Sequence, residues 1–230
     1  MVPDPAARPS VSLRSGLPRA IEIPVAALGL ALSLPVLVLA SLAIRLSSGS
    51  PVLFRQTRLG RAGRGFALVK LRTMRSRPGG PDVTAGDDPR ITRIGAWLRR
   101  SKVDELPQLW NVLRGDMGLV GPRPETPGYV DLEDPRWIRV LSARPGLTDP
   151  ASIRYRDEER LMADVPDDRD RYYRDVLLPA KLELSLAYLS RRTWRSDVAV
   201  LFRTLTRVLG FGGGLREERP TGAAGDGAER

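Results

Sequence analysis

Residues 23–44 carry no charged side chain, and they are flanked by Glu22 and Arg45. As one α-helix this segment would be about 33 Å long, which matches the hydrocarbon thickness of a bilayer. A helix of this length that is apolar on all sides is rarely buried in a small soluble domain. The segment is therefore predicted to lie in a membrane, and this placement constrains the architecture of the whole chain.

Three membrane arrangements compete for this segment. A cleaved signal peptide is disfavoured, because the apolar run is longer than the usual signal-peptide core. A single spanning helix is the simplest arrangement. A re-entrant helix, which enters and leaves by one face, gains support from Pro35, because a proline in mid-segment leaves two arms too short to cross. The residues alone leave the last two open, but arginines flank both ends and predict a cytoplasmic location for the downstream domain.

The chain contains no cysteine and no histidine. Disulfides, zinc–thiolate sites, thiol nucleophiles, Ser-His-Asp triads and imidazole acid–base chemistry are therefore excluded. Catalysis would have to rely on carboxylates, Lys, Arg, Tyr, Ser or Thr, with a hard cation bound through oxygen. The formal net charge is +10, and residues 45–102 hold 14 Lys or Arg against three Asp. This excess predicts an anionic partner, such as a phosphate-bearing substrate, a lipid headgroup surface or nucleic acid.

The rest of the chain is predicted to be α+β and mainly helical. Residues 51–74 are predicted to form a short β-hairpin around a glycine-rich turn. Apolar periodicity and helix-end residues predict helices over residues 91–100, 104–115, 180–192 and 196–209. The expected organisation is a flexible basic arm over residues 1–19, a membrane helix over 20–46, one domain over 47–211 and a disordered tail over 212–230.

Asp104 and Glu105 are the strongest candidates for chemistry, because they form a carboxylate pair at a predicted helix start in the most basic part of the chain. A helix N-terminus favours phosphate and ionised carboxylates. A carboxylate there can attack phosphorus or bind Mg²⁺. The structural alternative is that Asp104 caps the helix and that Glu105 complements its dipole.

Four basic residues are candidates for binding an anion. Arg99 precedes the carboxylate pair by five residues and could reach the same group if the chain turns back. Lys70 and Arg72 share one face of a predicted strand and could contact a pyrophosphate. Arg123 lies between two prolines, which restrict the loop and lower the entropy lost on binding. Taken singly, each could equally be a solvated surface residue.

Four segments share their order and spacing with a known family. They are FALVKLRTM over residues 66–74, DPRITRIGAWLR over 88–99, DELPQLWNVLRGDM over 104–117 and VGPRP over 120–124. Together they resemble the bacterial sugar transferases, the monotopic polyprenyl-phosphate phosphoglycosyl transferases that start bacterial surface-glycan assembly. The resemblance covers about residues 20–210, and it is to the minimal form of the family.

The resemblance implies a reaction and a membrane topology. It implies that Asp104 is the nucleophile that takes a phospho-sugar from a nucleotide sugar, here expected to be a UDP-sugar, and releases UMP. Polyprenyl phosphate would then attack the covalent intermediate, and Mg²⁺ would be held by Asp104 and Glu105. It also implies a re-entrant helix broken at Pro35 and a catalytic domain on the cytoplasmic face of the bacterial inner membrane.

The resemblance also suggests the residues that bind substrate. The resemblance matches Lys70, Arg99, Arg123 and Asp197 to such residues. Arg72, which shares the strand face of Lys70, and Arg156 complete the predicted set. Residues 149–156 depart from the family pattern, and because this segment is expected to contact the sugar or the nucleotide, the identity of the sugar is not inherited. The oligomeric state does not follow from the sequence.

Two other functions compete with this enzyme. One is a non-enzymatic, membrane-tethered module that binds anionic lipid or nucleic acid through the basic stretch. An aromatic content of 6% and the absence of a nucleic-acid motif argue against nucleic acid. The other is an inactive scaffold, which is disfavoured because every catalytic position that the resemblance matches is intact.

Overall fold

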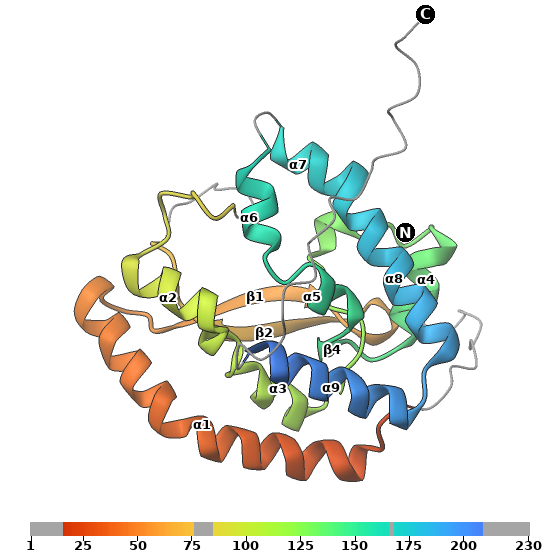
Figure 1. The fold of residues 1–230 in the computed structure, drawn as a ribbon, viewed down its shortest axis with the longest axis horizontal. Coiled ribbons are helices and arrows are strands. Elements are labelled where there is room, and N and C mark those ends of the chain that lie inside the picture. Colours follow the sequence, from red (N-terminus) through yellow and green to blue (C-terminus); the bar gives the residue numbers. More distant parts are fainter. Residues whose placement is uncertain (1–15, 76–84, 166–167, 209–230) are drawn as a thin grey trace, which may run out of the picture.

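The computed structural model describes residues 16–75, 85–165 and 168–208. Within these ranges helices surround two small two-stranded sheets (Figure 1). This arrangement confirms the predicted α+β, mainly helical class. The predicted tail over residues 212–230 and most of the predicted arm lie outside the described residues.

Helix α1 (Arg19–Ser48) contains the apolar segment and runs along the lower edge of the domain (Figure 1). Its length and its mean hydropathy of 2.4 are sufficient for a membrane span. The predicted break at Pro35 is wrong in one respect, because α1 is one continuous helix that bends along its length (Figure 1). A proline inside a helix removes one hydrogen bond and favours a bend without requiring an interruption.

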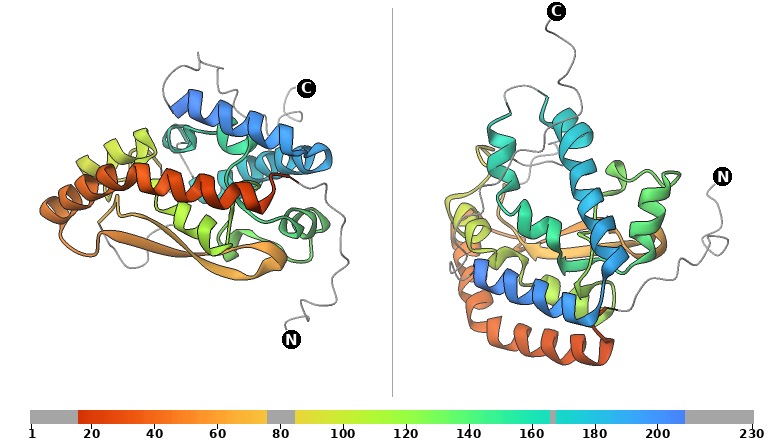
Figure 2. Two further views of the ribbon diagram at one scale, coloured as in Figure 1. Left: turned by 90° about the horizontal axis from the view of Figure 1, so that it is seen from below. Right: turned by 45° about the vertical axis from the view of Figure 1, so that its right-hand side comes forward.

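Both arms of α1 pack on the same domain. The first arm contacts α3 (Gln108–Arg114) and β3 (Gly118–Val120), where Ala26 lies fully buried beside Leu109. The second arm contacts α2 (Arg93–Ser101), where Ile44 packs on Leu98. Seen from below, α1 passes between the β1–β2 hairpin on one side and α9 on the other (Figure 2).

The predicted hairpin is confirmed. Strand β1 (Leu53–Leu59) pairs with β2 (Gly65–Leu71) in antiparallel register. The buried side chain of Asn111 on α3 accepts a hydrogen bond from the backbone of Val69 at 3.0 Å and donates one to the carbonyl of Ala67 at 2.8 Å. A side chain thus satisfies backbone groups that a third strand would otherwise pair.

The second sheet was not predicted. Strand β3 pairs in parallel with β4 (Gly146–Thr148), and each strand has only three residues, too few to give a periodic signal. The strands approach closely, because a Cβ built on Gly146 would lie 2.0 Å from the backbone nitrogen of Gly121. The loop that carries Arg123 leaves from the end of β3.

Most of the remaining helices build the upper half of the domain, whereas the last helix lies in the lower half near α1 (Figure 1). Helices α8 (Leu178–Arg191) and α9 (Trp194–Val208) confirm the two predicted C-terminal helices. A π-helical turn, η5 (Tyr173–Leu177), leads directly into α8. Other elements that were not predicted include η2 (Arg61–Gly63), η4 (Pro127–Tyr129), α4 (Pro135–Ser142), α5 (Pro150–Arg154), α6 (Glu158–Ala163) and α7 (Arg169–Tyr172).

Candidate active site

The carboxylate pair lies in the junction between α2 and α3. Lys102 ends α2 in the left-handed conformation, with φ 58°, and turns the chain into the short 3-10 turn η3 (Val103–Glu105). The predicted helix start at Asp104 is therefore wrong, because α3 begins four residues later, directly after Pro107. Asp104 does not cap α3, so cationic side chains, rather than a helix N-terminus, surround the carboxylates.

Asp104 is a buried carboxylate with an unpartnered oxygen. Its side chain belongs to a residue only 5% exposed, and Oδ1 has no hydrogen-bond partner among the described residues. Burial, together with the neighbouring Glu105 carboxylate, raises the pKa of Asp104 to about 6, although Lys70 and Lys102 oppose the shift. A carboxylate that is poorly solvated and not hydrogen-bonded is a stronger nucleophile than one in water.

Glu105 has the opposite environment. Its two oxygens accept hydrogen bonds from the two terminal nitrogens of Arg123, at 2.9 and 3.2 Å. Burial alone would raise the pKa of Glu105, but the Arg123 guanidinium outweighs burial and lowers this pKa to about 2. Two adjacent carboxylates thus differ in pKa, because only one of them has an arginine partner.

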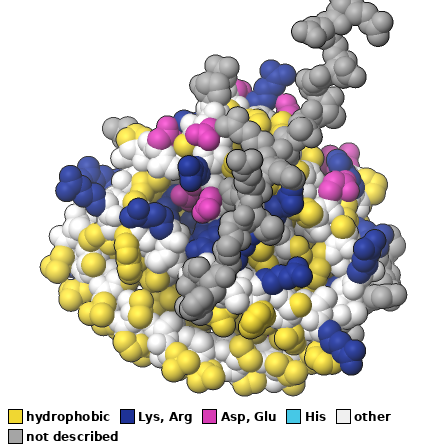
Figure 3. Space-filling view, viewed as in Figure 1, with side chains coloured by type: hydrophobic (Ala, Val, Ile, Leu, Met, Phe, Trp, Pro, Cys, Tyr) yellow, Lys and Arg dark blue, Asp and Glu magenta, His cyan; other side chains and the backbone are white. Residues whose placement is uncertain are grey.

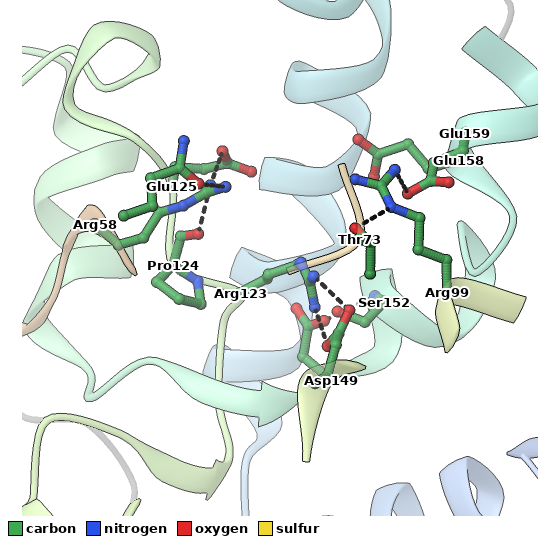
Figure 4. A network of polar contacts seen from close by, with 12 residues as sticks. Arg58, Thr73, Arg99, Arg123, Pro124, Glu125, Asp149, Ser152, Glu158 and Glu159 are labelled. Atoms are coloured by element: carbon green, nitrogen blue, oxygen red, sulfur yellow. Dashed lines mark hydrogen bonds and ion pairs between the residues drawn. The ribbon is translucent and has the colours of Figure 1, made fainter. Parts of the chain in front are cut away.

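Further cations surround the pair. Lys70 lies on β2 with its ammonium 5.3 Å from the centre of the Phe54 ring, and burial together with Arg99 lowers its pKa to about 8. Arg99 is buried on α2, where it donates to the hydroxyl of Thr73 at 2.9 Å and to Glu159 at 2.7 Å (Figure 4). The structure therefore brings Lys70, Arg99 and Arg123 into one electrostatic group with the carboxylates.

Three other predicted binding residues make contacts with the fold instead. Arg72 donates to two backbone carbonyls at the C-terminal end of α1, at 2.6 and 2.7 Å. Arg156 donates to a backbone carbonyl near the end of α9. Asp197 is fully buried and accepts hydrogen bonds from Arg192 and from the backbone of Leu17, both at 2.8 Å. Their roles in substrate binding remain predictions, and these contacts explain why they are buried or ordered without a substrate.

A buried polar cluster beside Arg123 was not predicted from the sequence. Glu125 follows the Pro-Arg-Pro loop, is 6% exposed, and accepts hydrogen bonds from Tyr173 at 2.8 Å and Lys181 at 3.3 Å. Lys181 also contacts Glu158 at 3.0 Å. Glu125 could have been found from the sequence, because it directly follows the Pro-Arg-Pro loop. Tyr173 and Lys181 lie 48 and 56 residues further along the chain, and no local pattern connects them to the site.

The carboxylates of Asp104 and Glu105 suit an ion such as Mg²⁺, which also takes ligands from water and substrate, better than an ion that needs only protein ligands. Among the described residues no group of three or more acidic side chains could enclose an ion. Mg²⁺ usually takes one or two carboxylates and completes its shell with water and substrate phosphates. Asp104 fits that pattern through its oxygen free of hydrogen bonds, and Glu105 would fit it if Arg123 released one of its oxygens.

Known proteins resemble this chain in sequence. A UDP-glucose:undecaprenyl-phosphate glucose-1-phosphate transferase from Caulobacter vibrioides is 50% identical over 156 residues, covering 65% of this chain and 57% of that protein. A UDP-N-acetylgalactosamine-undecaprenyl-phosphate N-acetylgalactosaminephosphotransferase from Aeromonas hydrophila is 34% identical over 200 residues, covering 84% of this chain and 44% of that protein. The chain thus spans about half the length of these two relatives.

A relative of similar length also matches. The exopolysaccharide production protein PSS from Rhizobium leguminosarum bv. phaseoli is 37% identical over 209 residues, covering 85% of this chain and 98% of that protein. The sequence model that describes bacterial sugar transferases matches residues 13–211, which include α1 and every site residue described above. The chain therefore belongs to the bacterial sugar transferase family.

Proposed function

We propose that this chain is a polyprenyl-phosphate phosphoglycosyl transferase, which moves a sugar 1-phosphate from a UDP-sugar to polyprenyl phosphate and so initiates assembly of a surface glycan. The observation that carries the proposal is the buried Asp104 carboxylate, which has one oxygen without a partner and lies among Lys70, Arg99 and Lys102. The names of the Caulobacter and Aeromonas relatives support the same reaction class and a uridine diphosphate donor.

Asp104 is the proposed nucleophile. Its free oxygen attacks the phosphorus that carries the sugar, and the bond from that phosphorus to the bridging oxygen breaks. UMP leaves with the electron pair of that bond. An oxygen of polyprenyl phosphate then attacks the same phosphorus, and the bond to Asp104 breaks and restores the carboxylate. Glu105 is less suited to the attack, because Arg123 holds both of its oxygens.

The basic residues stabilise the charge of the substrate. The donor carries two negative phosphates, and Lys70, Arg99 and Arg123 lie around the nucleophile in a largely buried site where charges interact strongly. When bound, Mg²⁺ would be held by Asp104 and Glu105 and would neutralise part of the charge on the diphosphate. Arg123 can exchange its contact with Glu105 for a phosphate, because a guanidinium matches both groups.

The membrane arrangement that we propose is re-entrant. Both arms of α1 pack on one domain, so a bilayer that separated the two ends would have to pass between contacting side chains. The outer face of α1 is apolar, with Leu28, Leu32 and Leu39 more than 60% exposed, and hydrophobic side chains gather along this edge of the molecule (Figure 3). With arginines at both ends, this arrangement places the domain on the cytoplasmic face of the inner membrane.

The test is release of UMP by the detergent-solubilised full chain, supplied with Mg²⁺, polyprenyl phosphate and a series of UDP-sugars. We expect one sugar to give UMP release that depends on the lipid and that disappears in Asp104→Asn. The matched control is Asp170→Asn, which removes a carboxylate paired with Arg174 at the surface. Release that persists in Asp104→Asn would contradict the assignment of the nucleophile. Salt-sensitive binding of anionic lipid without turnover would instead favour a tethered binding module.

A further inference from the structure

Lys181 is the centre of a buried cluster that the proposed chemistry does not use. It lies on α8 and is 7% exposed. Its ammonium contacts the hydroxyl of Tyr173 at 3.0 Å, Glu158 at 3.0 Å and Glu125 at 3.3 Å. These partners come from three separate segments, namely η5, α6 and the loop after β3. One side chain therefore joins parts of the chain that are far apart in sequence.

The loop partner of Lys181 is adjacent to Arg123. Glu125 follows Arg123 by two residues, and the intervening Pro124 restricts the backbone between them. Arg58 on β1 adds contacts to the Pro124 carbonyl at 3.2 Å and to Glu125 at 3.3 Å. The backbone of Leu59 also donates to the Glu125 carbonyl at 2.9 Å. The position of the Arg123 side chain thus depends on how Glu125 is held.

The helix partner of Lys181 is adjacent to the residue that holds Arg99. Glu158 contacts Lys181, and the next residue, Glu159, accepts a hydrogen bond from Arg99 at 2.7 Å. Arg123 lies between the two contact groups, with Arg58 and Glu125 on one side and Arg99, Glu158 and Glu159 on the other (Figure 4). Lys181 therefore connects the supports of both arginines.

We propose that Lys181, together with Tyr173, is a positioning residue that sets the placement of Arg99 and Arg123 for binding the diphosphate of the donor. This inference rests on the proposed function, which it deepens by naming residues outside the site that control donor binding. Neither residue touches the reacting atoms: Lys181 acts through Glu125 and Glu158, and Tyr173 acts through Glu125 and Lys181.

A buried cluster of ion pairs is better suited to fixing the positions of its side chains than to stabilising the fold. Buried ion pairs seldom add much stability, because desolvation of the charges offsets their attraction. Removing one member, by contrast, leaves a buried charge without its partner and makes the remaining groups move. Burial opposes the charge of Lys181, but Glu158, Tyr173 and Glu125 outweigh burial and hold the pKa of Lys181 well above its ordinary value. The amine therefore stays charged at any pH at which the protein works.

Lys181→Met keeps the length of the side chain and removes its charge. Glu125 would keep only Arg58 and Tyr173, and Glu158 would lose its cation. We expect both carboxylates to turn towards the remaining arginines, and Glu125 and Glu158 already act electrostatically on Arg123. An arginine drawn to a protein carboxylate is less available to a phosphate, so the donor should bind more weakly.

Two tyrosines give a matched pair of variants. The rings of Tyr129 and Tyr173 pack edge to face, with centroids 4.9 Å apart. The Tyr173 hydroxyl points into the cluster, whereas the Tyr129 hydroxyl donates to the exposed Asp170. Tyr173→Phe and Tyr129→Phe therefore each remove one hydroxyl from the same ring pair, and only the first removes a contact with the cluster.

The experiment measures the dissociation constant of UDP with Mg²⁺ for the full chain in detergent, alongside its melting temperature. We expect Lys181→Met to weaken UDP binding by about fivefold or more and Lys181→Arg to stay within about twofold of the wild type. Tyr173→Phe should weaken binding, and Tyr129→Phe should not. In steady-state assays the KM for the donor should rise more than kcat falls, because the defect is in placing the binding arginines.

A purely structural cluster would give a different result. Lys181→Met and Tyr173→Phe would then lower the melting temperature while the folded protein bound UDP as tightly as the wild type, and the inference would be wrong. If Lys181→Met does not fold, the comparison of the two tyrosine variants decides. Binding that depends on Lys181 in a chain that never releases UMP would overturn the proposed function and leave this inference standing.

Discussion

At the scale of single residues, the environment of each carboxylate assigns its role. Asp104 and Glu105 are neighbours in one turn, yet Arg123 holds both oxygens of Glu105 and leaves Asp104 with an unpartnered oxygen. The result is one carboxylate that ionises easily and one whose ionisation is opposed by burial. A buried carboxylate that lacks a hydrogen-bond partner is more reactive, and it makes the folded protein less stable.

Asp104→Asn should therefore stabilise the metal-free protein at neutral pH. The pKa of Asp104 is raised from 3.8 to about 6, so ionising this group costs the folded state free energy. That cost is absent below pH 4 and complete above pH 6, because the unfolded chain ionises first. We expect a gain of roughly 1–3 kcal/mol in the free energy of unfolding at pH 7.5 and little gain at pH 4. Denaturant unfolding at both pH values checks this, and an equal change at both would contradict it.

Lys70 should set the alkaline limit of activity. Burial lowers its pKa to about 8, so Lys70 loses its positive charge as the pH rises through that value. If this charge stabilises the donor diphosphate, kcat/KM falls above pH 8, and Lys70→Arg should maintain its own rate to higher pH because arginine stays protonated. The pH profiles of the wild type, Lys70→Arg and Lys70→Met test the point. Parallel alkaline losses in the wild type and in Lys70→Arg would remove Lys70 from this role.

The sequence could identify charged residues but not their partners. Asp104, Glu105, Lys70, Arg99 and Arg123 were predicted as one group, and the structure brings them together. The contacts of Arg72 with the end of α1 and of Asp197 with Leu17 were not predictable, because these partners come from distant segments. For the same reason the cluster around Lys181 left no signal in the sequence.

At the scale of elements, α1 is fixed to the domain at both ends. Near its start, the buried Glu22 accepts a hydrogen bond from the backbone of Leu119 at 3.0 Å, and Arg19 donates to carbonyls at the end of α3. At its end, Arg72 donates to the carbonyls of Ser48 and Gly49. The last carbonyls of a helix need such partners, and here the hairpin supplies them.

Arg72→Met should loosen the end of α1 without affecting donor binding. Loss of the guanidinium leaves the partly buried carbonyls of Ser48 and Gly49 without this partner, which costs about 1 kcal/mol or more. We expect faster hydrogen exchange near Ser48, a lower melting temperature and a donor KM within about twofold of the wild type. Arg75→Met, which removes an exposed arginine nearby, is the control. A raised KM with unchanged exchange would instead support the predicted role of Arg72 in substrate binding.

Periodicity predicted the long elements and failed for the short ones. The hairpin, α2, α8 and α9 each bury one face or stripe, and such patterns are visible in a sequence. Strands β3 and β4 have three residues each, and α5 has five, so no period can develop. The start of α3 was misplaced because Asp104 followed by Pro107 is typical of a helix N-terminus, whereas Lys102 in the left-handed conformation inserts a separate turn.

At the scale of the whole molecule, the position of α1 supports the proposed re-entrant arrangement. In a spanning arrangement, one arm of α1 would enter the bilayer away from the rest of the domain. Instead Ala26 on the first arm and Ile44 on the second are both buried against the domain, at 0% and 1% exposure. Buried positions in both arms favour a bilayer on the exposed outer side of α1, as the proposed re-entrant arrangement requires. The apolar segment and Pro35 can be read from the sequence. The contact of both arms of α1 with one domain could not be predicted, because it depends on the tertiary fold.

Both ends of α1 should therefore be on the same side of the membrane as the catalytic domain. Because the chain contains no cysteine, single-cysteine variants can be labelled at chosen positions without further changes. We would place cysteine at position 12, ahead of α1, at the exposed Ser50 after it, and at the exposed Glu183 on α8. A membrane-impermeant maleimide should label all three in inverted inner-membrane vesicles and none in intact spheroplasts. Labelling of Ser12→Cys in intact spheroplasts, with Ser50→Cys and Glu183→Cys protected, would establish a spanning helix and contradict the re-entrant arrangement.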